Sequence, residues 1–167
     1  MTDQSNGAPA TNGAADGPPP LAPAIRVLAQ YVRDLSFENP GAPNSLREQG
    51  AQPKIDLQLD VNARRLEEEG LFEVGLRVNA RSTRDDGSVL FIVELDYAGL
   101  FGFANVPADA IEQLVLVECP RLLLPFAREI VATATRNGGF PPLLIDPMDF
   151  GALYASQRQA QQQTANA

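Results

Sequence analysis

Strict two-residue alternation of apolar and polar side chains restricts the fold of this chain more than any other feature. Over residues 54–61 the apolar positions are Ile55, Leu57, Leu59 and Val61, and the positions between them are Lys54, Asp56, Gln58 and Asp60. Consecutive side chains of an extended strand point to opposite faces, so this segment is predicted to be a strand with one apolar and one hydrated face. Strands of that kind are typical of an antiparallel sheet that is covered on one side.

Three more segments, 25–37, 71–81 and 89–97, carry the same period and are predicted to be strands. In the first of them the apolar residues of one parity, expected to share one face, are Ile25, Val27, Ala29, Tyr31, Leu35 and Phe37. The sequence Asp85-Asp86-Gly87-Ser88 predicts a hairpin turn before the last strand, because Asp-Gly tolerates positive φ. That last strand is apolar on both faces at its start, so its second face is expected to meet another subunit or a ligand.

Beyond Gly99 and Gly102 the period changes to that of a helix, which is predicted to end in a left-handed cap at Asn137-Gly138-Gly139. Pro120 has no backbone N–H and is expected to kink or restart this helix. The stripe predicted for its later turns consists of Leu123, Phe126, Ala127, Ile130 and Ala134. The apolar residues expected on its outer face are Leu122, Leu124 and Val131. An apolar outer face favours a homo-oligomer.

An extended segment, 140–147, is expected to lead into a short last helix capped by Asp149. Together the elements predict an α+β fold: a four-stranded antiparallel sheet with a long bent helix packed on one face and a short C-terminal helix. Residues 1–23, rich in Ala, Gly, Pro, Asn and Asp, are predicted to be a disordered tail. Residues 24–155 form the predicted folded domain, and residues 156–167 a flexible Gln-rich tail.

The charge and residue inventory exclude several classes of function. A net charge of −8 argues against nucleic-acid binding and favours a basic partner, although acidity also serves solubility alone. The chain has no histidine and no glycine-rich phosphate-binding motif. Its acidic runs, 67–69 and 85–86, fall in predicted loops that suit solvated carboxylates better than acid–base catalysis. We therefore expect no enzyme activity, no catalytic residues, no metal site and no cofactor.

The single cysteine, Cys119, is expected to be a buried structural thiol rather than a nucleophile. Its neighbour Glu118 would raise a thiol pKa instead of lowering it. One cysteine allows no internal disulfide, which fits a reducing cytosol. The N-terminus carries no basic region followed by an apolar core, and no apolar run is long enough to span a membrane, so a cytoplasmic location is expected.

Several motifs, in order along the chain, resemble the family of the bacterial protein-export chaperone SecB. The resemblance covers about residues 25–154 and is most specific in the helix block 119–129. The matching segments are Tyr31-Val32-Arg33-Asp34-Leu35-Ser36-Phe37-Glu38-Asn39-Pro40 with Ala42-Pro43, Phe72-Glu73-Val74 with Leu76-Arg77-Val78, Phe91-Ile92-Val93-Glu94 with Gly99-Leu100-Phe101, Cys119-Pro120-Arg121-Leu122-Leu123-Leu124-Pro125-Phe126-Ala127-Arg128-Glu129, Gly139-Phe140-Pro141-Pro142-Leu143 and Pro147-Met148-Asp149-Phe150-Gly151-Ala152-Leu153-Tyr154.

The resemblance implies an ATP-independent bacterial chaperone that holds precursor proteins unfolded and delivers them to the motor ATPase SecA. It implies a homotetramer, a dimer of dimers, with a domain of this family over residues 24–155. By position, the motor-binding residues would be Asp34, Glu38, Ile92 and Glu94, facing the motor and its basic, zinc-bearing C-terminal tail. Residues that influence tetramer assembly would be Val93, Leu95 and Tyr97. The long N-terminal tail is additional to the family core.

A client groove must accept many sequences, so apolar pockets are expected to line it. The candidate lining residues, all apolar and placed on strands, loops or the last helix, are Phe37, Leu46, Ile55, Leu57, Leu59, Phe101, Phe103, Phe150, Leu153 and Tyr154. Two other functions stay open at this point. One is a general or antitoxin-linked holdase on the same scaffold without motor targeting, and the other is a domain that binds one small ligand.

Overall fold

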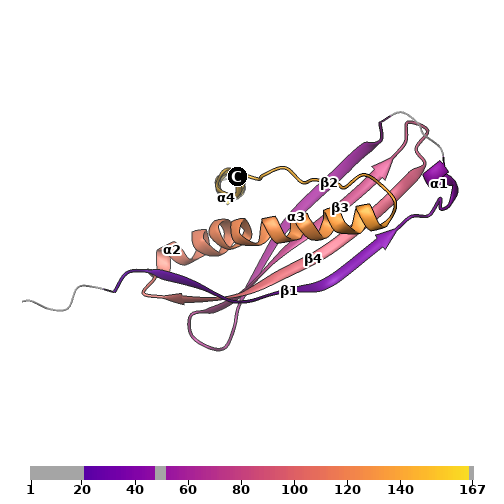
Figure 1. Cartoon of the computed structure of the whole chain (residues 1–167). Helices are drawn as coiled ribbons and strands as arrows, with labels where there is room; N and C mark the ends of the chain where they lie inside the picture. Colours follow the sequence, from indigo (N-terminus) through magenta and orange to yellow (C-terminus); the bar gives the residue numbers. More distant parts are fainter. Residues whose placement is uncertain (1–20, 48–51, 166–167) are drawn as a thin grey trace, which may run out of the picture.

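The protein forms one four-stranded antiparallel sheet with a long helix along one face (Figure 1). A computed structural model describes residues 21–47 and 52–165. The strands lie in the order β1-β4-β3-β2, so β1 and β2 are the edges. The elements are β1 (Ala24–Glu38), α1 (Asn44–Arg47), β2 (Lys54–Arg65), β3 (Leu71–Thr83), β4 (Val89–Ala104), α2 (Ala108–Gln113), the π-helical turn η1 (Leu114–Glu118), α3 (Cys119–Asn137) and α4 (Phe150–Ala165). The predicted α+β class is confirmed.

The core lies between α3 and the two central strands. Alternate residues of β3 and β4 face the helix and are almost fully buried, whereas the charged side chains of both strands lie on the other face. The buried side chains on the two sides of this layer include Val74, Leu76, Val78, Val93, Leu95, Leu123, Ala127 and Val131. Burying one such side chain contributes about 1.5–3 kcal/mol. The edge strands receive less cover, so part of their apolar surface remains exposed.

Strand β4 is longer than its sequence predicted. It continues beyond the predicted end at Tyr97, through Gly99 and Gly102, to Ala104, and the helix begins only at Ala108. A Cβ on Gly99 would lie 2.6 Å from the Phe101 ring and 3.0 Å from the Leu123 side chain. The glycine therefore leaves room for these buried side chains against the strand instead of ending it.

Strand β1 contains two bulges. Its pairing with β4 shifts between Val27 and Ala29 and again between Val32 and Asp34. Each shift inserts one extra residue, so the first reverses the faces that follow and the second restores them. Only the short segment 29–32 is turned over.

This turned segment corrects one prediction. Ala29 and Tyr31, expected to share the apolar face, lie on the face opposite the helix, where the Tyr31 hydroxyl donates a hydrogen bond to Glu73. Leu35 and Phe37, beyond the second bulge, lie on the helix side as predicted. The two bulges in the pairing of β1 with β4 cause this reversal, and the periodicity of the β1 sequence alone does not reveal them.

The predicted kink or restart at Pro120 takes the form of a change from π-helical to α-helical geometry, and the helix continues without a break. The chain passes from α2 through η1 into α3, whose first residues are Cys119 and Pro120. Proline removes a backbone donor from the ladder, and a π-helical turn before it accommodates that loss. Gly139, with φ of 87°, supplies the predicted left-handed cap: its N–H bonds to the Arg136 carbonyl at 3.0 Å.

The predicted faces of α3 need correction. Leu124 and Val131, expected on the outer face, are buried in the core, whereas Leu122 is exposed as predicted. Phe126, expected within the inward stripe, is 51% exposed. The buried side of α3 follows helical spacing through Leu124, Ala127, Val131 and Thr135, so it is centred on a different line of residues from the predicted stripe and leaves Phe126 outside it.

Two segments differ from their predicted extent. The loop after β1 contains the short helix α1, which the sequence did not indicate. Helix α4 begins beyond Asp149, whose carboxylate accepts the Ala152 N–H at 3.0 Å, and continues to Ala165 through the predicted Gln-rich tail. The predicted N-terminal tail lies, up to residue 20, outside the described residues. None of the helices that the structure describes combines the length and apolarity needed to cross a bilayer.

Candidate functional site

The first candidate surface lies on the face of the sheet opposite α3. We call it the acidic face, and its residues are Asp34, Glu38, Ile92 and Glu94. Glu38 pairs with Ile92, and Ser36 beside Asp34 pairs with Glu94, so the four residues come together on the adjacent strands β1 and β4. Asp34, Glu38 and Glu94 are exposed, while Ile92 is half-buried. The register thus unites residues that are more than fifty positions apart in the sequence.

The same face continues onto β3 and β2. Arg81 pairs with Ile92, and Asn79 pairs with Glu94. Beyond them, Asp56 and Gln58 of β2 complete a shallow hollow of about 260 Å³ around Ile92 and Glu94. This surface is polar with one apolar side chain near its middle, which suits contact with a basic protein segment rather than a compact ligand.

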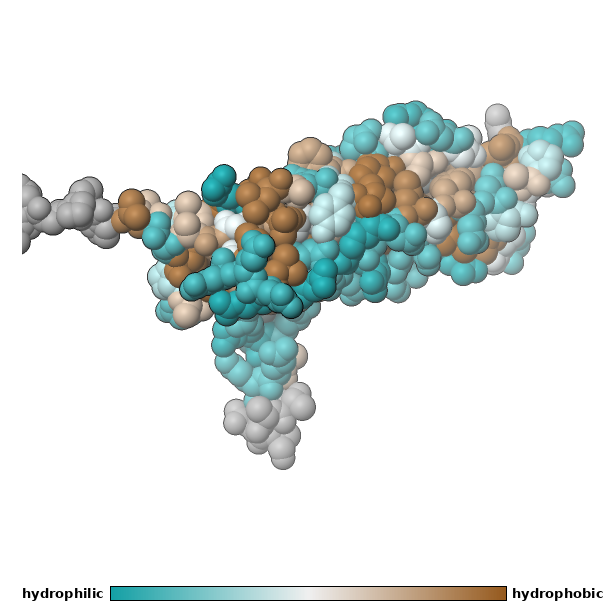
Figure 2. Space-filling view, turned by 90° about the horizontal axis from the view of Figure 1, so that it is seen from below, coloured by the Kyte–Doolittle hydropathy of each residue, from teal (hydrophilic) through white to brown (hydrophobic). Residues whose placement is uncertain are grey.

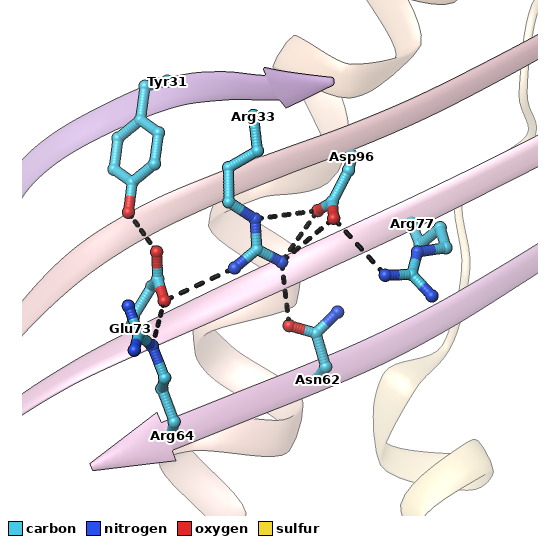
Figure 3. A network of polar contacts seen from close by, with 7 residues as sticks. All are labelled: Tyr31, Arg33, Asn62, Arg64, Glu73, Arg77 and Asp96. Atoms are coloured by element: carbon cyan, nitrogen blue, oxygen red, sulfur yellow. Dashed lines mark hydrogen bonds and ion pairs between the residues drawn. The ribbon is translucent and has the colours of Figure 1, made fainter. Parts of the chain in front are cut away.

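A network of ion pairs crosses all four strands next to the acidic face (Figure 3). Arg33 of β1 donates to both carboxylate oxygens of Asp96 at 2.9 and 3.1 Å and to Asn62 Oδ1 of β2 at 3.1 Å. It also lies 3.4 Å from Glu73 Oε2 on β3. Arg77 Nη2 approaches Asp96 Oδ2 at 3.5 Å. The guanidinium of an edge strand therefore ties together both central strands and the far edge.

Glu73 is the most enclosed charge of this network, with only 7% of its side chain exposed. It accepts hydrogen bonds from the Tyr31 hydroxyl and the Arg64 guanidinium, and these bonds hold the pKa of its carboxyl below the ordinary value. Burial, followed by the bond to Glu73, raises the pKa of Tyr31. The Arg33 pKa is lowered by desolvation, but the hydrogen bond and charge of Asp96 outweigh this and raise it overall.

The second candidate surface is an apolar groove between β2 and the helices. Its central pocket, about 270 Å³, is lined mainly by Leu59 and Val61 of β2, Leu116 of η1, and Phe150, Leu153 and Tyr154 of α4. An adjoining pocket of about 470 Å³ shares Leu116 and extends to Ala63, Arg65, Phe72, Ile111 and Val115. We call both pockets together the groove. Leu116 and Ile111 were missed by sequence reasoning, since an apolar residue in a helix is most simply interpreted as core.

The predicted client residues fall into separate places. Leu59, Phe150, Leu153 and Tyr154 meet in the groove, with Phe150 almost fully buried at its base. Ile55, on the same edge strand, is 40% exposed, and Leu57 beside it is half-buried.

The remaining predicted client residues lie away from the groove's centre. Phe37 packs on Phe91 and Phe140, and Leu46 lies exposed on α1 at that end of the molecule. Phe103 packs against Phe72 at the opposite end. Phe101 is fully buried, so in this conformation its side chain offers no surface to a client.

The predicted assembly residues lie inside the subunit. Val93 and Leu95 are fully buried beneath α3, and the Tyr97 ring stacks on Phe126 with centroids 6.4 Å apart. They can influence contact with another copy only through the elements they support. The apolar side chains that are exposed on edge strand β1 and on α3 are Val27, Leu28, Val32, Leu35, Leu122 and Phe126. Figure 2 shows apolar patches along the body beside a largely hydrophilic surface.

Cys119 is fully buried, as predicted. Burial, and to a lesser degree the charge of Glu118, raises its pKa to about 12. A thiol of this kind is protonated at neutral pH and is shielded from reagents, so it has no nucleophilic role.

Comparisons with known proteins show the family to which the chain is similar. A family model described as the preprotein translocase subunit SecB matches residues 20–162. Protein-export protein SecB of Maricaulis maris is 57% identical over 157 residues, covering 94% of this chain and 87% of the relative. The protein of the same name from Hyphomonas neptunium is 54% identical and covers 99% and 96% of the two chains.

One solved structure shares the fold at low sequence identity. It is a SecB-like chaperone of Mycobacterium tuberculosis in complex with a peptide from an antitoxin, with a TM-score of 0.61. It is 15% identical to this chain, and the match covers 74% of this chain and 90% of the other. Because the family model spans the whole sheet and the helices, and close relatives share half of their residues with it, the chain belongs to the SecB family of protein-export chaperones.

Proposed function

We propose that this protein, as an export chaperone of the Sec pathway, holds precursor proteins unfolded without ATP and delivers them to the motor ATPase SecA. The observation that carries the proposal is the separation of two surfaces on one sheet. The apolar groove lies on the helix side, and the acidic face lies on the opposite side. A client in the groove therefore leaves the acidic face open to a second protein.

The groove suits unfolded chains. It is lined mainly by apolar side chains from β2, β3, α2, η1 and α4, and it runs beside an edge strand. The polar and charged residues in its lining are Asp60, Arg64, Arg65, Glu112 and Gln157. Apolar pockets of this kind accept many different sequences. Each buried Leu- or Phe-sized client side chain contributes about 1.5–3 kcal/mol. The peptide-bound SecB-like chaperone of the same fold supports this reading.

The acidic face suits a basic partner. Among the described residues, Asp34, Glu38 and Glu94 take part in no ion pair, so their charges are available to an incoming cation. The proposed partner surface is the motor, including its basic, zinc-bearing C-terminal tail. Ile92 among these carboxylates adds apolar contact to the electrostatic attraction.

We further propose that the protein acts in the bacterial cytoplasm as a homotetramer, a dimer of dimers. The exposed apolar residues on β1 and α3 support a second copy against these elements, because water-exposed Leu and Phe side chains gain free energy when covered. Several grooves on one assembly hold a long client more tightly by effective concentration.

The client proposal is tested by refolding a slow-folding precursor with and without the protein, in the absence of nucleotide. The wild type is expected to arrest refolding at stoichiometric amounts. Leu59→Asp, which places a charge in the groove, should release the client, whereas Gln58→Asp places the same charge on the opposite face and should not. Equal arrest by both variants, each with wild-type circular dichroism, would show that the groove is not the client site.

The motor proposal is tested separately. The double variant Asp34→Ala with Glu94→Ala should keep client arrest and lose affinity for purified SecA, because two of the unpaired carboxylates are removed. A wild type that arrests clients but has no affinity for SecA would instead fit a general or antitoxin-linked holdase.

A further inference from the structure

The second bulge of β1 places two charged residues on the same face of the sheet. Val32 pairs with Tyr97 and Asp34 pairs with Asp96, so Arg33 is the extra residue. Arg33 contacts Asp96 and Asn62, which places its side chain on the same face as Asp34. A bulge of this kind turns the strand locally.

Small residues make a path for the Arg33 side chain across the sheet. Gly75 on β3 pairs with Ala98 on β4 and with Asn62 on β2. A Cβ on Gly75 would lie only 2.6 Å from Arg33 Nη2. Only because glycine stands there can the guanidinium reach Asn62 on the far edge strand while it holds Asp96 (Figure 3).

The position of the Arg33 side chain affects the balance of charge on this face of the sheet. Asp34 and Asp96 are directly paired carboxylates on one face, and like charges in that position repel. Arg33 and Arg77 both contact Asp96, so its charge is balanced inside the sheet. Asp34 and the other carboxylates of the acidic face are left for a partner.

We propose that Arg33 is a positioning residue for the acidic face. Its bidentate hydrogen bond to Asp96 fixes the conformation of the β1 bulge and so keeps Asp34 and Glu38 next to Ile92 and Glu94 on the adjacent strand. This inference rests on the proposed function, since it assumes that the acidic face binds the motor. In this proposal the positively charged Arg33 contributes to the binding of a basic partner by holding the carboxylates in place, not by its own charge.

The sign of the effect separates this role from simple electrostatics. If Arg33 acted only through its charge, its removal would make the face more acidic and tighten binding of a basic partner. If Arg33 positions the face, its removal releases the bulge and weakens binding despite the more favourable net charge.

The experiment compares Arg33→Met with Arg26→Met by titration of each full-length protein with purified SecA at fixed salt. Both variants remove one arginine charge from the same face of β1, but Arg26 is exposed, pairs with Gly102, and lies outside the second bulge and the acidic face. We expect roughly tenfold weaker binding for Arg33→Met and equal or tighter binding for Arg26→Met. Binding by Arg33→Met that equals or exceeds that of Arg26→Met would overturn the proposal.

A second variant guards against loss of fold. Asp96→Asn keeps the shape of the side chain but removes the carboxylate that Arg33 holds, and it should weaken binding in the same direction. The double variant Arg33→Met with Asp96→Asn should lose less affinity than the sum of the two single losses, because both changes break the same Arg33–Asp96 interaction, while Asp96→Asn also affects the contact with Arg77. Additive losses would overturn the proposal. Client arrest through the groove on the other face should remain intact in all three.

A measurement that does not involve the motor distinguishes failure of the positioning role of Arg33 from failure of the proposed motor binding. Backbone amide shifts of residues 32–38 should change in Arg33→Met and not in Arg26→Met. If wild-type protein failed to bind SecA, the proposed function would fail. Unchanged amide shifts in Arg33→Met would overturn the positioning role whether or not the motor binds.

Discussion

At the scale of single residues, Glu73 shows how a sheet tolerates an enclosed charge. Its carboxylate is 7% exposed and receives hydrogen bonds from Tyr31 and Arg64, while Arg33 lies 3.4 Å away. A charge in this position is stable only when its oxygens are bonded to donors. The low pKa of Glu73 is the direct consequence, because the partners favour the ionised form.

The change Glu73→Gln is therefore expected to lower the free energy of unfolding by about 2 kcal/mol at pH 7. The folded-state pKa of Glu73 lies below its unfolded value, so the wild-type advantage exists above the unfolded pKa and disappears as pH falls through the folded one. Urea unfolding of both proteins from pH 7 down to pH 3 measures this difference. The exposed loop variant Glu69→Gln serves as a control with no expected effect, and a difference for Glu73→Gln that stayed constant with pH would contradict the argument.

At the scale of elements, β3 offers a glycine whose role is defined by its neighbours on other strands. Glycine inside a strand normally costs about 0.5–1 kcal/mol relative to alanine. In the middle of β3, Gly75 leaves room for the Arg33 and Asn62 side chains, each of which would lie 2.6 Å from a Cβ at this position. Both are ends of flexible side chains, so a methyl group displaces them without breaking the sheet.

Gly75→Ala is expected to destabilise the protein by about 1 kcal/mol, because lost ion pairs outweigh the gain from a stiffer backbone. Gly102→Ala on β4 is the matched control, since its nearest neighbours would be at the ordinary distance of 3.6 Å. That variant should be neutral or slightly more stable. Urea unfolding of the two variants side by side checks the prediction, and equal stability would mean that the network contributes nothing.

At the scale of the whole molecule, a single chain leaves part of its apolar surface exposed to solvent. Leu122 is 43% and Phe126 51% exposed on α3, and four apolar residues of edge strand β1 are similarly open. The layer between α3 and the sheet has no such open surface, because Val93 and Leu95 are fully buried there. In the proposed assembly, a second copy would cover the outer side chains of α3 and β1, and the buried residues of β4 would contribute only by supporting these elements.

The double variant Leu122→Ser with Phe126→Ser is expected to reduce the mass of the assembly to about half or less, because it removes apolar area that a second copy would cover. Light scattering across a range of protein concentrations measures this. Glu67→Ser with Glu69→Ser, two exposed changes in the β2–β3 loop, should leave the mass unchanged. An unchanged mass for the α3 variant would place the interface elsewhere.

The sequence by itself determined the type and order of the main elements. Two-residue alternation located all four strands, the helical period located the long helix, and Gly139 and Asp149 closed and opened helices where predicted. These features depend on neighbours within a few residues, which sequence patterns report directly. Asp34, Glu38, Ile92 and Glu94 also came together as expected, since two bulges in β1 cancel each other.

Only the tertiary structure decided the features that depend on distant partners. The turning of Tyr31 towards Glu73, the reach of Arg33 over Gly75, the burial of Phe101 and the place of Leu116 in the groove all depend on contacts between separate elements. A bulge moves a side chain to the other face without changing the residue pattern of its strand. Periodicity therefore predicted the elements, while the register between strands and the packing of the helices determined which side chains share a surface.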